Sequence, residues 1–172
     1  MRYIAIICVF IGCVLGGFWR DLDQKKRIKE LESFGYVFEI LKAEIDYRLT
    51  PLKDACSMAA SRIDDECIIG IMNHFQDSIQ EKKYINISDM WTNSINCNKS
   101  QLHLKEEDIK VLYQFGAICG CIDKNMEKRN IEMCISALNE VIFKAKEDYI
   151  KESKLNKSLG VLIGLAISIF LI

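Results

Sequence analysis

The residues that could do chemistry in this sequence are few and scattered. The two histidines, His74 and His103, have no cysteine or carboxylate neighbour at a metal-ligand spacing. Cys119 and Cys121 lie two residues apart, so on a helix their side chains point in different directions and form neither a zinc pair nor a redox pair. The sequence also lacks a glycine-rich phosphate loop. We therefore predict no metal, no cofactor and no enzymatic activity.

Acidic residues cluster at 64–66 and 106–108, where they could be imagined as general acids and bases. Helix starts explain both clusters more simply, because carboxylates in a first turn complement the helix dipole. The eight cysteines show no disulfide framework in their spacing. We interpret them as small buried thiols of a reducing compartment.

Four residues stand out as polar or aromatic side chains within otherwise regular helical patterns: Glu44, Tyr47, Trp91 and Asp123. One interpretation is a surface that docks a partner, since exposed aromatic side chains often anchor interfaces. The other is structural: Trp91 and Tyr47 fill the core, while Glu44 and Asp123 bond to buried backbone or hydroxyl groups. The structural interpretation is favoured for Trp91, and both stay open for the other three.

The elements that position these residues are helices, organised around a corner at Thr50 and Pro51. Apolar residues recur every three or four positions from Ile28 to Leu49, as one buried helix face requires. Proline disfavours the α conformation in the residue before it, so this helix should end near Leu49. Thr50 is predicted to cap the next helix through its hydroxyl, with Pro51 in the first helical position.

The remaining patterns predict further helices and no sheet, since nothing alternates at period two for long. We expect a helix to about Arg62, another after 64–66, a loop over Lys82–Ile87, a helix capped by Ser88, a loop over Asn96–Ser100, a helix from 105–108, and a last long helix from about Asp123. The prediction is an all-α antiparallel helical bundle. This middle region holds all 24 acids and 22 of the 23 bases, a net charge of −2 that argues against a nucleic-acid partner.

Two apolar runs flank the bundle. Tyr3–Trp19 and Leu159–Ile172 contain no charged residue, and each is followed or preceded by several lysines and arginines. We expect a retained signal anchor rather than a cleaved leader, because only Met1 and Arg2 precede the first run. The predicted domains are an anchor at 1–20, a cytoplasmic bundle at 21–154, and a transmembrane helix at 155–172 that continues the last bundle helix.

Glycines repeat four residues apart in both runs: Gly12 with Gly16, and Gly160 with Gly164. Small residues at this spacing let helices approach closely in lipid. Measured from the cytoplasmic boundary, the two pairs lie at matching depths. One interpretation is therefore an antiparallel hairpin packed through these glycines, and the other is chance occurrence in apolar sequence.

Three segments of the sequence are distinctive: LKAEIDYRLTPLKDA (Leu41–Ala55), LYQFGAICGCID (Leu112–Asp123) and KSLGVLIGL (Lys157–Leu165). Together they resemble the stage III sporulation protein AB family of endospore-forming Firmicutes. Trp91 and the two terminal spans add to the resemblance, which covers nearly the whole chain. The E-I-x-Y-x-x-T-P-L core is the most specific part.

The resemblance implies a fold similar to the cytoplasmic domains of the inner-membrane platform protein of type II secretion and type IV pilus machines. It also implies a non-enzymatic scaffold in the channel that joins mother cell and forespore, located in the mother-cell membrane. The implied partners are a secretion-type ATPase (stage III sporulation protein AA), other stage III channel proteins, membrane lipid and further copies of the chain. Glu44, Tyr47, Arg48 and Asp123 are the predicted docking residues. A membrane-tethered regulator or sensor without a channel role is the alternative.

Overall fold

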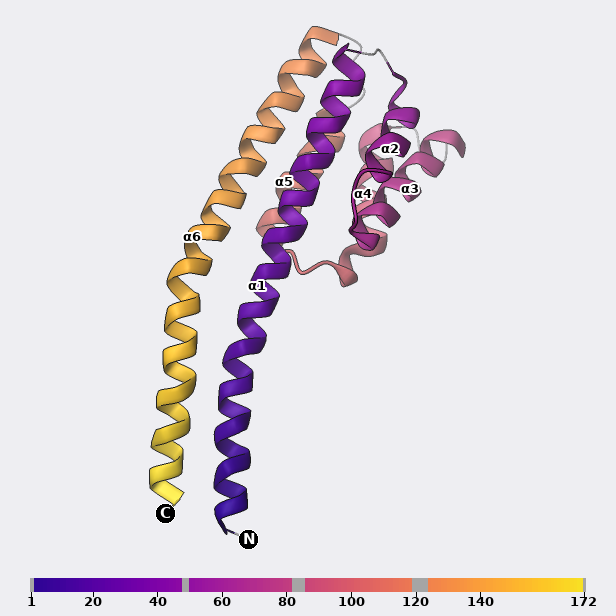
Figure 1. The fold of residues 1–172 in the computed structure, drawn as a ribbon. Coiled ribbons are helices and arrows are strands. Elements are labelled where there is room, and N and C mark those ends of the chain that lie inside the picture. Colours follow the sequence, from indigo (N-terminus) through magenta and orange to yellow (C-terminus); the bar gives the residue numbers. More distant parts are fainter. Residues whose placement is uncertain (1, 48–49, 82–85, 119–123, 172) are drawn as a thin grey trace. The chain divides into compact units, whose positions relative to one another are not determined.

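The computed structural model describes the backbone over residues 2–47, 50–81, 86–118 and 124–171. Side chains are described at residues 16, 19–45, 50–81, 86–118, 129–153, 158 and 162. All the regular structure in the described part of the chain is helical, which confirms the predicted all-α class (Figure 1). The helices are α1 (Arg2–Tyr47), α2 (Leu52–Ala60), α3 (Glu66–Glu81), α4 (Ile87–Asn98), the 3₁₀ helix η1 (Lys99–Gln101), α5 (Glu106–Ile118) and α6 (Lys124–Leu171).

The chain forms two compact units. The first, which we call the helix pair, comprises Met1–Ile28 and Phe143–Ile172; the second, the body, comprises Lys29–Ile142. Both long helices contribute to both units, since α1 and α6 continue without a break across the boundaries. The helix pair includes residues 21–28 and 143–154, and the predicted domain boundaries stay a prediction.

The body is built around Trp91 of α4, whose indole is fully buried. Its Nε1–H donates to the Leu112 carbonyl of α5 at 2.7 Å. The ring packs edge-on against Phe75 of α3 at 5.1 Å between centroids, and it also contacts Phe38 of α1 and Phe115 of α5. Aromatic pairs in such geometries stabilise a core beyond the area they bury. A single side chain thus ties four helices together, as the structural interpretation of Trp91 predicts.

Gly116 makes room for this tryptophan. A Cβ built on Gly116 would lie 2.6 Å from Trp91 Cδ1 and 2.8 Å from Trp91 Cβ, which is closer than real Cβ atoms approach. A Cβ built on Gly35 of α1, by contrast, would meet Ile142 and Leu138 of α6 at ordinary distances of 3.6 and 3.9 Å. Close packing is therefore required at Gly116, whereas Gly35 makes only ordinary contact with α6.

Two predicted helix starts are wrong in detail. The hydroxyl of Thr50 does not cap α2, because it donates to Glu44 Oε2 at 3.3 Å; Pro51 occupies the cap position, and its carbonyl accepts the N–H of Asp54 and Ala55. Ser88 lies inside the first turn of α4, whose cap residue is Asn86.

The predicted loop at 96–100 is helical instead, because α4 continues to Asn98 and η1 follows. The Asn98 side chain supports this continuation by donating to the Ser94 carbonyl one turn back at 3.0 Å. The acidic start of α3 is confirmed, since Asp65 Oδ1 accepts the N–H groups of Cys67 and Ile68.

The predicted membrane spans fall mainly on side chains outside the described set. Among the residues that are described, no helical stretch has both the length and the hydropathy of a membrane crossing. Gly12, Gly160 and Gly164 also lie outside that set. No described atom lies within 4 Å of a Cβ built on Gly16. The glycine-packed hairpin stays a prediction.

A candidate docking surface

The corner between α1 and α2 is closed by Glu44, whose side chain is 4% exposed. Its carbonyl accepts the Thr50 N–H at 3.1 Å, and its Oε2 accepts the Thr50 hydroxyl. Its Oε1 lies 3.9 Å from Nη2 of Arg62, which is two residues beyond the end of α2. Burying a carboxylate is unfavourable unless polar partners replace its water, and these contacts do so. Of the two interpretations of Glu44, the observed contacts are those of the structural one.

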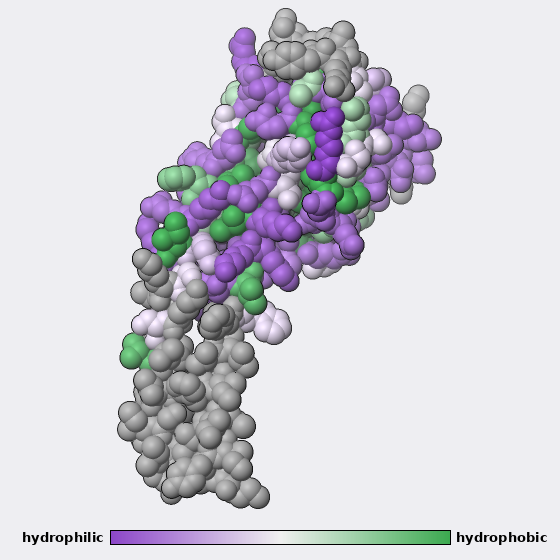
Figure 2. Space-filling view, viewed as in Figure 1, coloured by the Kyte–Doolittle hydropathy of each residue, from purple (hydrophilic) through white to green (hydrophobic). Residues whose placement is uncertain are grey.

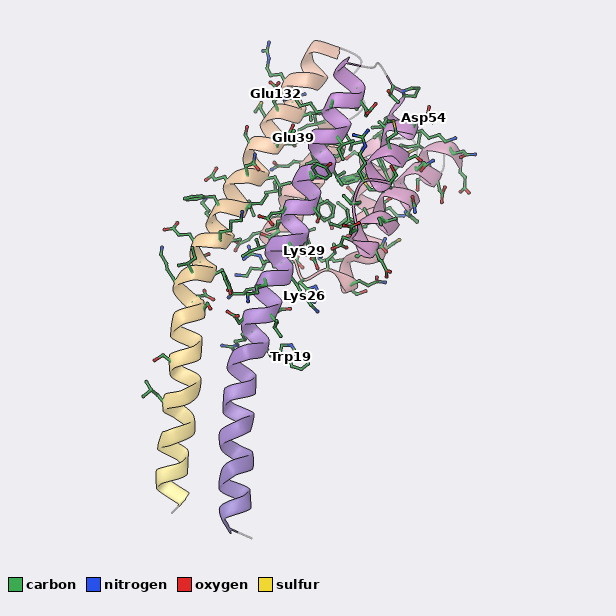
Figure 3. All side chains as sticks on the ribbon, in the orientation of Figure 1. Trp19, Lys26, Lys29, Glu39, Asp54 and Glu132 are labelled. Atoms are coloured by element: carbon green, nitrogen blue, oxygen red, sulfur yellow. The ribbon has the colours of Figure 1, made fainter. Side chains whose placement is uncertain are left out.

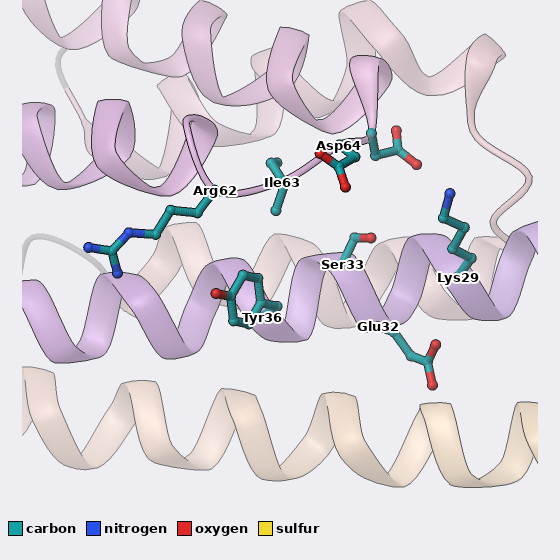
Figure 4. Close-up of a pocket in the computed structure, with 8 residues that line it drawn as sticks. Lys29, Glu32, Ser33, Tyr36, Arg62, Ile63 and Asp64 are labelled. Atoms are coloured by element: carbon teal, nitrogen blue, oxygen red, sulfur yellow. The ribbon is translucent and has the colours of Figure 1, made fainter.

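A shallow hollow of about 270 Å³ lies between α1 and the segment that joins α2 to α3, at the end of α2 opposite the corner (Figure 4). Its walls are formed by Lys29, Glu32, Ser33 and Tyr36 from one face of α1, and by Arg62, Ile63, Asp64 and Asp65. Tyr36 is 52% exposed and the Arg62 side chain is 45% exposed. Tyrosine and arginine are residue types enriched among the side chains that dominate protein interfaces.

The other predicted docking residues cannot be placed at the same level of detail. Tyr47 is the last helical residue of α1, and its side chain lies outside the described residues. Arg48 and Asp123 also lie outside them. The structure therefore places one of the four, Glu44, and adds Tyr36 and Arg62. These two were missed because nothing in the local pattern distinguishes an exposed tyrosine or arginine from any other surface residue.

A second polar contact was missed because its partners lie 73 residues apart in sequence. Glu30 of α1 is 6% exposed; its Oε2 accepts the His103 N–H at 2.8 Å, and its Oε1 lies 2.7 Å from His103 Nδ1. Burial raises the pKa of the Glu30 carboxyl, while the bonds from His103 act in the opposite direction. The pair fastens the segment between η1 and α5 to α1, which is a structural role for a histidine that the sequence left unexplained.

Two of the described thiols, Cys56 and Cys67, are of low reactivity. Burial raises the pKa of Cys56 to about 12. Burial, and then the charges of Asp65 and Glu30, raise the pKa of Cys67 to about 11. Among the described residues, no group of three histidine, cysteine or acidic side chains is placed to hold a metal ion. Cys97 is the exposed member of the described free cysteines.

Charge is divided unequally between the two units. The body has 13 lysines and arginines against 19 acids, a formal net charge of −6. The helix pair has 10 bases against 5 acids, a net charge of +5. Hydrophilic side chains cover most of the described body surface on the face shown in Figure 2. A basic partner surface would be attracted to the body, and an anionic surface to the helix pair.

The fold and the contacts define a class: an all-helical protein with two long terminal helices, whose buried polar groups at Glu44, Glu30 and Trp91 are bonded within the fold. Residues 2–172 match the protein family described as Stage III sporulation protein AB (spore_III_AB), and the chain belongs to that family. Family membership supports a role in sporulation.

Two relatives bear the same description. Stage III sporulation protein AB of Bacillus subtilis (strain 168) is 24% identical over 171 residues, which is 99% of each chain. A solved structure titled Stage III sporulation protein AB (SpoIIIAB) superposes with a TM-score of 0.67 at 23% identity, covering 73% of this chain and 97% of that chain. This likeness confirms the helical fold.

Proposed function

We propose that this protein is a non-enzymatic, membrane-anchored assembly component of the channel between mother cell and forespore, where it docks a secretion-type ATPase. The stage III family membership supports the sporulation role. The observation that carries the docking role is the hollow between α1 and the α2–α3 segment, because it combines an exposed tyrosine with an exposed arginine side chain.

The proposed docking surface is centred on Tyr36 and Arg62. Glu44 acts in this proposal by positioning Arg62, since its own carboxylate is buried in the corner. Tyr47, Arg48 and Asp123 stay proposed as further contact residues. The net charge of −6 on the body favours a partner with a basic face, and it adds to association rate and specificity more than to affinity.

The two predicted spans would hold the body against the cytoplasmic side of the mother-cell membrane. Lysines and arginines next to both apolar runs support this orientation through the positive-inside rule. In this arrangement the ATPase meets the body from the cytoplasm, and the helix pair transmits position or force to the other channel proteins.

Copurification from sporulating cells tests the proposal. The tagged full-length protein should bring down the ATPase and channel subunits, and Tyr36→Ala should reduce the ATPase yield at least tenfold, because truncated interface anchors commonly cost about 2 kcal/mol or more. Met133→Ala is the matched control: it also removes an exposed apolar side chain, 64% exposed, from the body but far along the chain from the hollow.

The alternative function, a membrane-tethered regulator or sensor without a channel role, gives a different result. A regulator would copurify with neither the ATPase nor the channel subunits. Equal ATPase yields from wild type, Tyr36→Ala and Met133→Ala would reject the docking surface while leaving the scaffold role intact.

A further inference from the structure

The helix pair presents two unlike faces of α1. One face meets α6: Asp21, 4% exposed, accepts the Tyr149 hydroxyl at 3.4 Å, and Gln24 Nε2 lies 2.5 Å from Glu152 Oε2. The two residues of each pair lie 128 positions apart in sequence, one on α1 and the other on α6. These contacts therefore show which side of α1 faces α6. At 100° per residue, the opposite side of the helix is the one that carries Trp19, Leu22 and Lys26.

The described side chains at residues 19, 22 and 26 on this outer side of α1 are exposed. Trp19 is 78% exposed and Leu22 is 56% exposed, the first being the most exposed of the large hydrophobic side chains described. Lys26 follows at the next turn and is exposed. Figure 3 shows Trp19 and Lys26 projecting from the side of α1 away from α6. Their spacing of three and four residues places all three on one stripe, about 10 Å long.

The order of the stripe matches the layers of a membrane surface. Trp19 is the last residue of the charge-free run, Leu22 lies one turn further, and Lys26 one turn beyond that. Tryptophan is enriched at the level of the lipid headgroups, where its ring is half in hydrocarbon and its N–H meets water. A lysine about 10 Å further out lies within reach of phosphate groups by extending its side chain.

The positive net charge of the helix pair favours anionic lipids over neutral ones. Its net charge of +5 includes Arg20, adjacent to Trp19, and it contrasts with −6 on the body. Each lysine or arginine near an anionic leaflet contributes about 1 kcal/mol of attraction, equivalent to roughly a fivefold preference. Asp23 is also exposed and lies on the same side of α1 as Trp19 and Lys26, so its charge offsets that of one of the two bases, Arg20 and Lys26.

We propose that the stripe Trp19–Leu22–Lys26, with Arg20, is a binding site for anionic phospholipid headgroups. This site rests on the membrane anchoring in the proposed function, and through it the anchor would also recognise the charge of the lipids. Trp19 and Leu22 lie at the boundary between acyl chains and headgroups, and Lys26 and Arg20 hold phosphates. The protein thereby concentrates acidic lipid around its anchor.

Bromine quenching of tryptophan fluorescence tests the site in the full-length chain reconstituted in vesicles of equal phosphatidylglycerol and phosphatidylcholine. Bromine is carried by the acyl chains of one lipid at a time. The chain has two tryptophans, and Trp91 is fully buried in the body, so the Trp19→Phe variant gives the background to subtract. We expect stronger quenching of Trp19 when phosphatidylglycerol carries the bromine.

Variants identify the charges responsible. Lys26→Gln should lower the preference for phosphatidylglycerol about fivefold, and 1 M salt should nearly abolish it, because the Debye length then falls to about 3 Å. Lys110→Gln, which removes an exposed lysine from α5 of the body, should leave the preference unchanged.

Each contrary result has its own meaning. Equal quenching by both lipids would overturn the lipid site while leaving the anchor intact. Absence of quenching in a protein that resists carbonate extraction would also overturn it, because the stripe would then be covered by protein. Release of the chain by carbonate would instead reject the membrane anchoring, and with it the proposed function.

Discussion

Substituting Gly116 by alanine tests how the body is held together. The added Cβ would lie 2.6–2.9 Å from three atoms of Trp91, and those atoms belong to the near end of a side chain fixed by four helices. Trp91 cannot retreat without lengthening its 2.7 Å bond to the Leu112 carbonyl. Gly116→Ala should therefore force either α5 or the indole to move.

The magnitude follows from three contributions. Overpacking a core costs about 1–3 kcal/mol, and weakening a buried hydrogen bond costs about 1 kcal/mol. Alanine in a helix interior recovers about 1 kcal/mol relative to glycine. The net expectation is a loss of about 1–3 kcal/mol in the free energy of unfolding, or roughly 4–8 °C in Tm for a loss of 2 kcal/mol in a chain of this size.

Gly70→Ala is the matched control, because Gly70 also lies inside a helix and its added Cβ would meet only Asn98 Oδ1, at an ordinary 3.7 Å. This variant should gain up to about 1 kcal/mol. Thermal unfolding of the full-length protein in detergent, followed by circular dichroism, measures both. If Gly116→Ala melts at or above the temperature of Gly70→Ala, the packing argument around Trp91 is refuted.

Three further predictions concern polar groups. Thr50→Val should lower the free energy of unfolding by about 1 kcal/mol, measured by urea titration, since the buried Glu44 carboxylate loses a donor; no change would show that the corner does not depend on this bond. Burial raises the pKa of Glu30, so the unfolded chain releases this proton more readily than the folded chain. The free energy of unfolding of wild type relative to Glu30→Gln should therefore fall as the pH rises from 4.5 through the folded-state pKa. An increase of this free-energy difference with pH would contradict the raised pKa. Maleimide at pH 8 should modify Cys97 well before Cys56, whose pKa is raised to about 12. Mass spectrometry of peptides measures the order of modification, and earlier modification of Cys56 would contradict this prediction.

The sequence predicted most of the helices because apolar periodicity and acidic first turns are local signals. The start of α3 shows this well, since Asp65 both follows the expected pattern and bonds the N–H groups it was expected to complement. Thr50 shows the limit: its type suits a helix cap, yet its hydroxyl bonds Glu44, six residues earlier. A rule based on local sequence cannot predict which acceptor the hydroxyl bonds when one of the possible acceptors comes close only in the folded chain.

Candidate site residues were harder to predict for the same reason. The bond between Glu30 and His103 joins positions 73 apart, and the hollow at Tyr36 and Arg62 exists only once α1 lies beside the α2–α3 segment. Gly116 was visible as a glycine in a helix, but the tryptophan that requires it lies on another helix. Such features follow from tertiary packing, which periodicity does not encode.

Site-specific photocrosslinking in sporulating cells tests the central proposal most directly. A photoreactive amino acid in place of Tyr36 lies in the proposed docking surface, and one in place of Met133 provides an exposed control on the same unit. We predict that the Tyr36 position crosslinks to the secretion-type ATPase, identified by mass spectrometry, and that the Met133 position does not. Crosslinking of the ATPase from Met133 alone, or from neither position in cells that complete sporulation, would contradict the proposed docking surface.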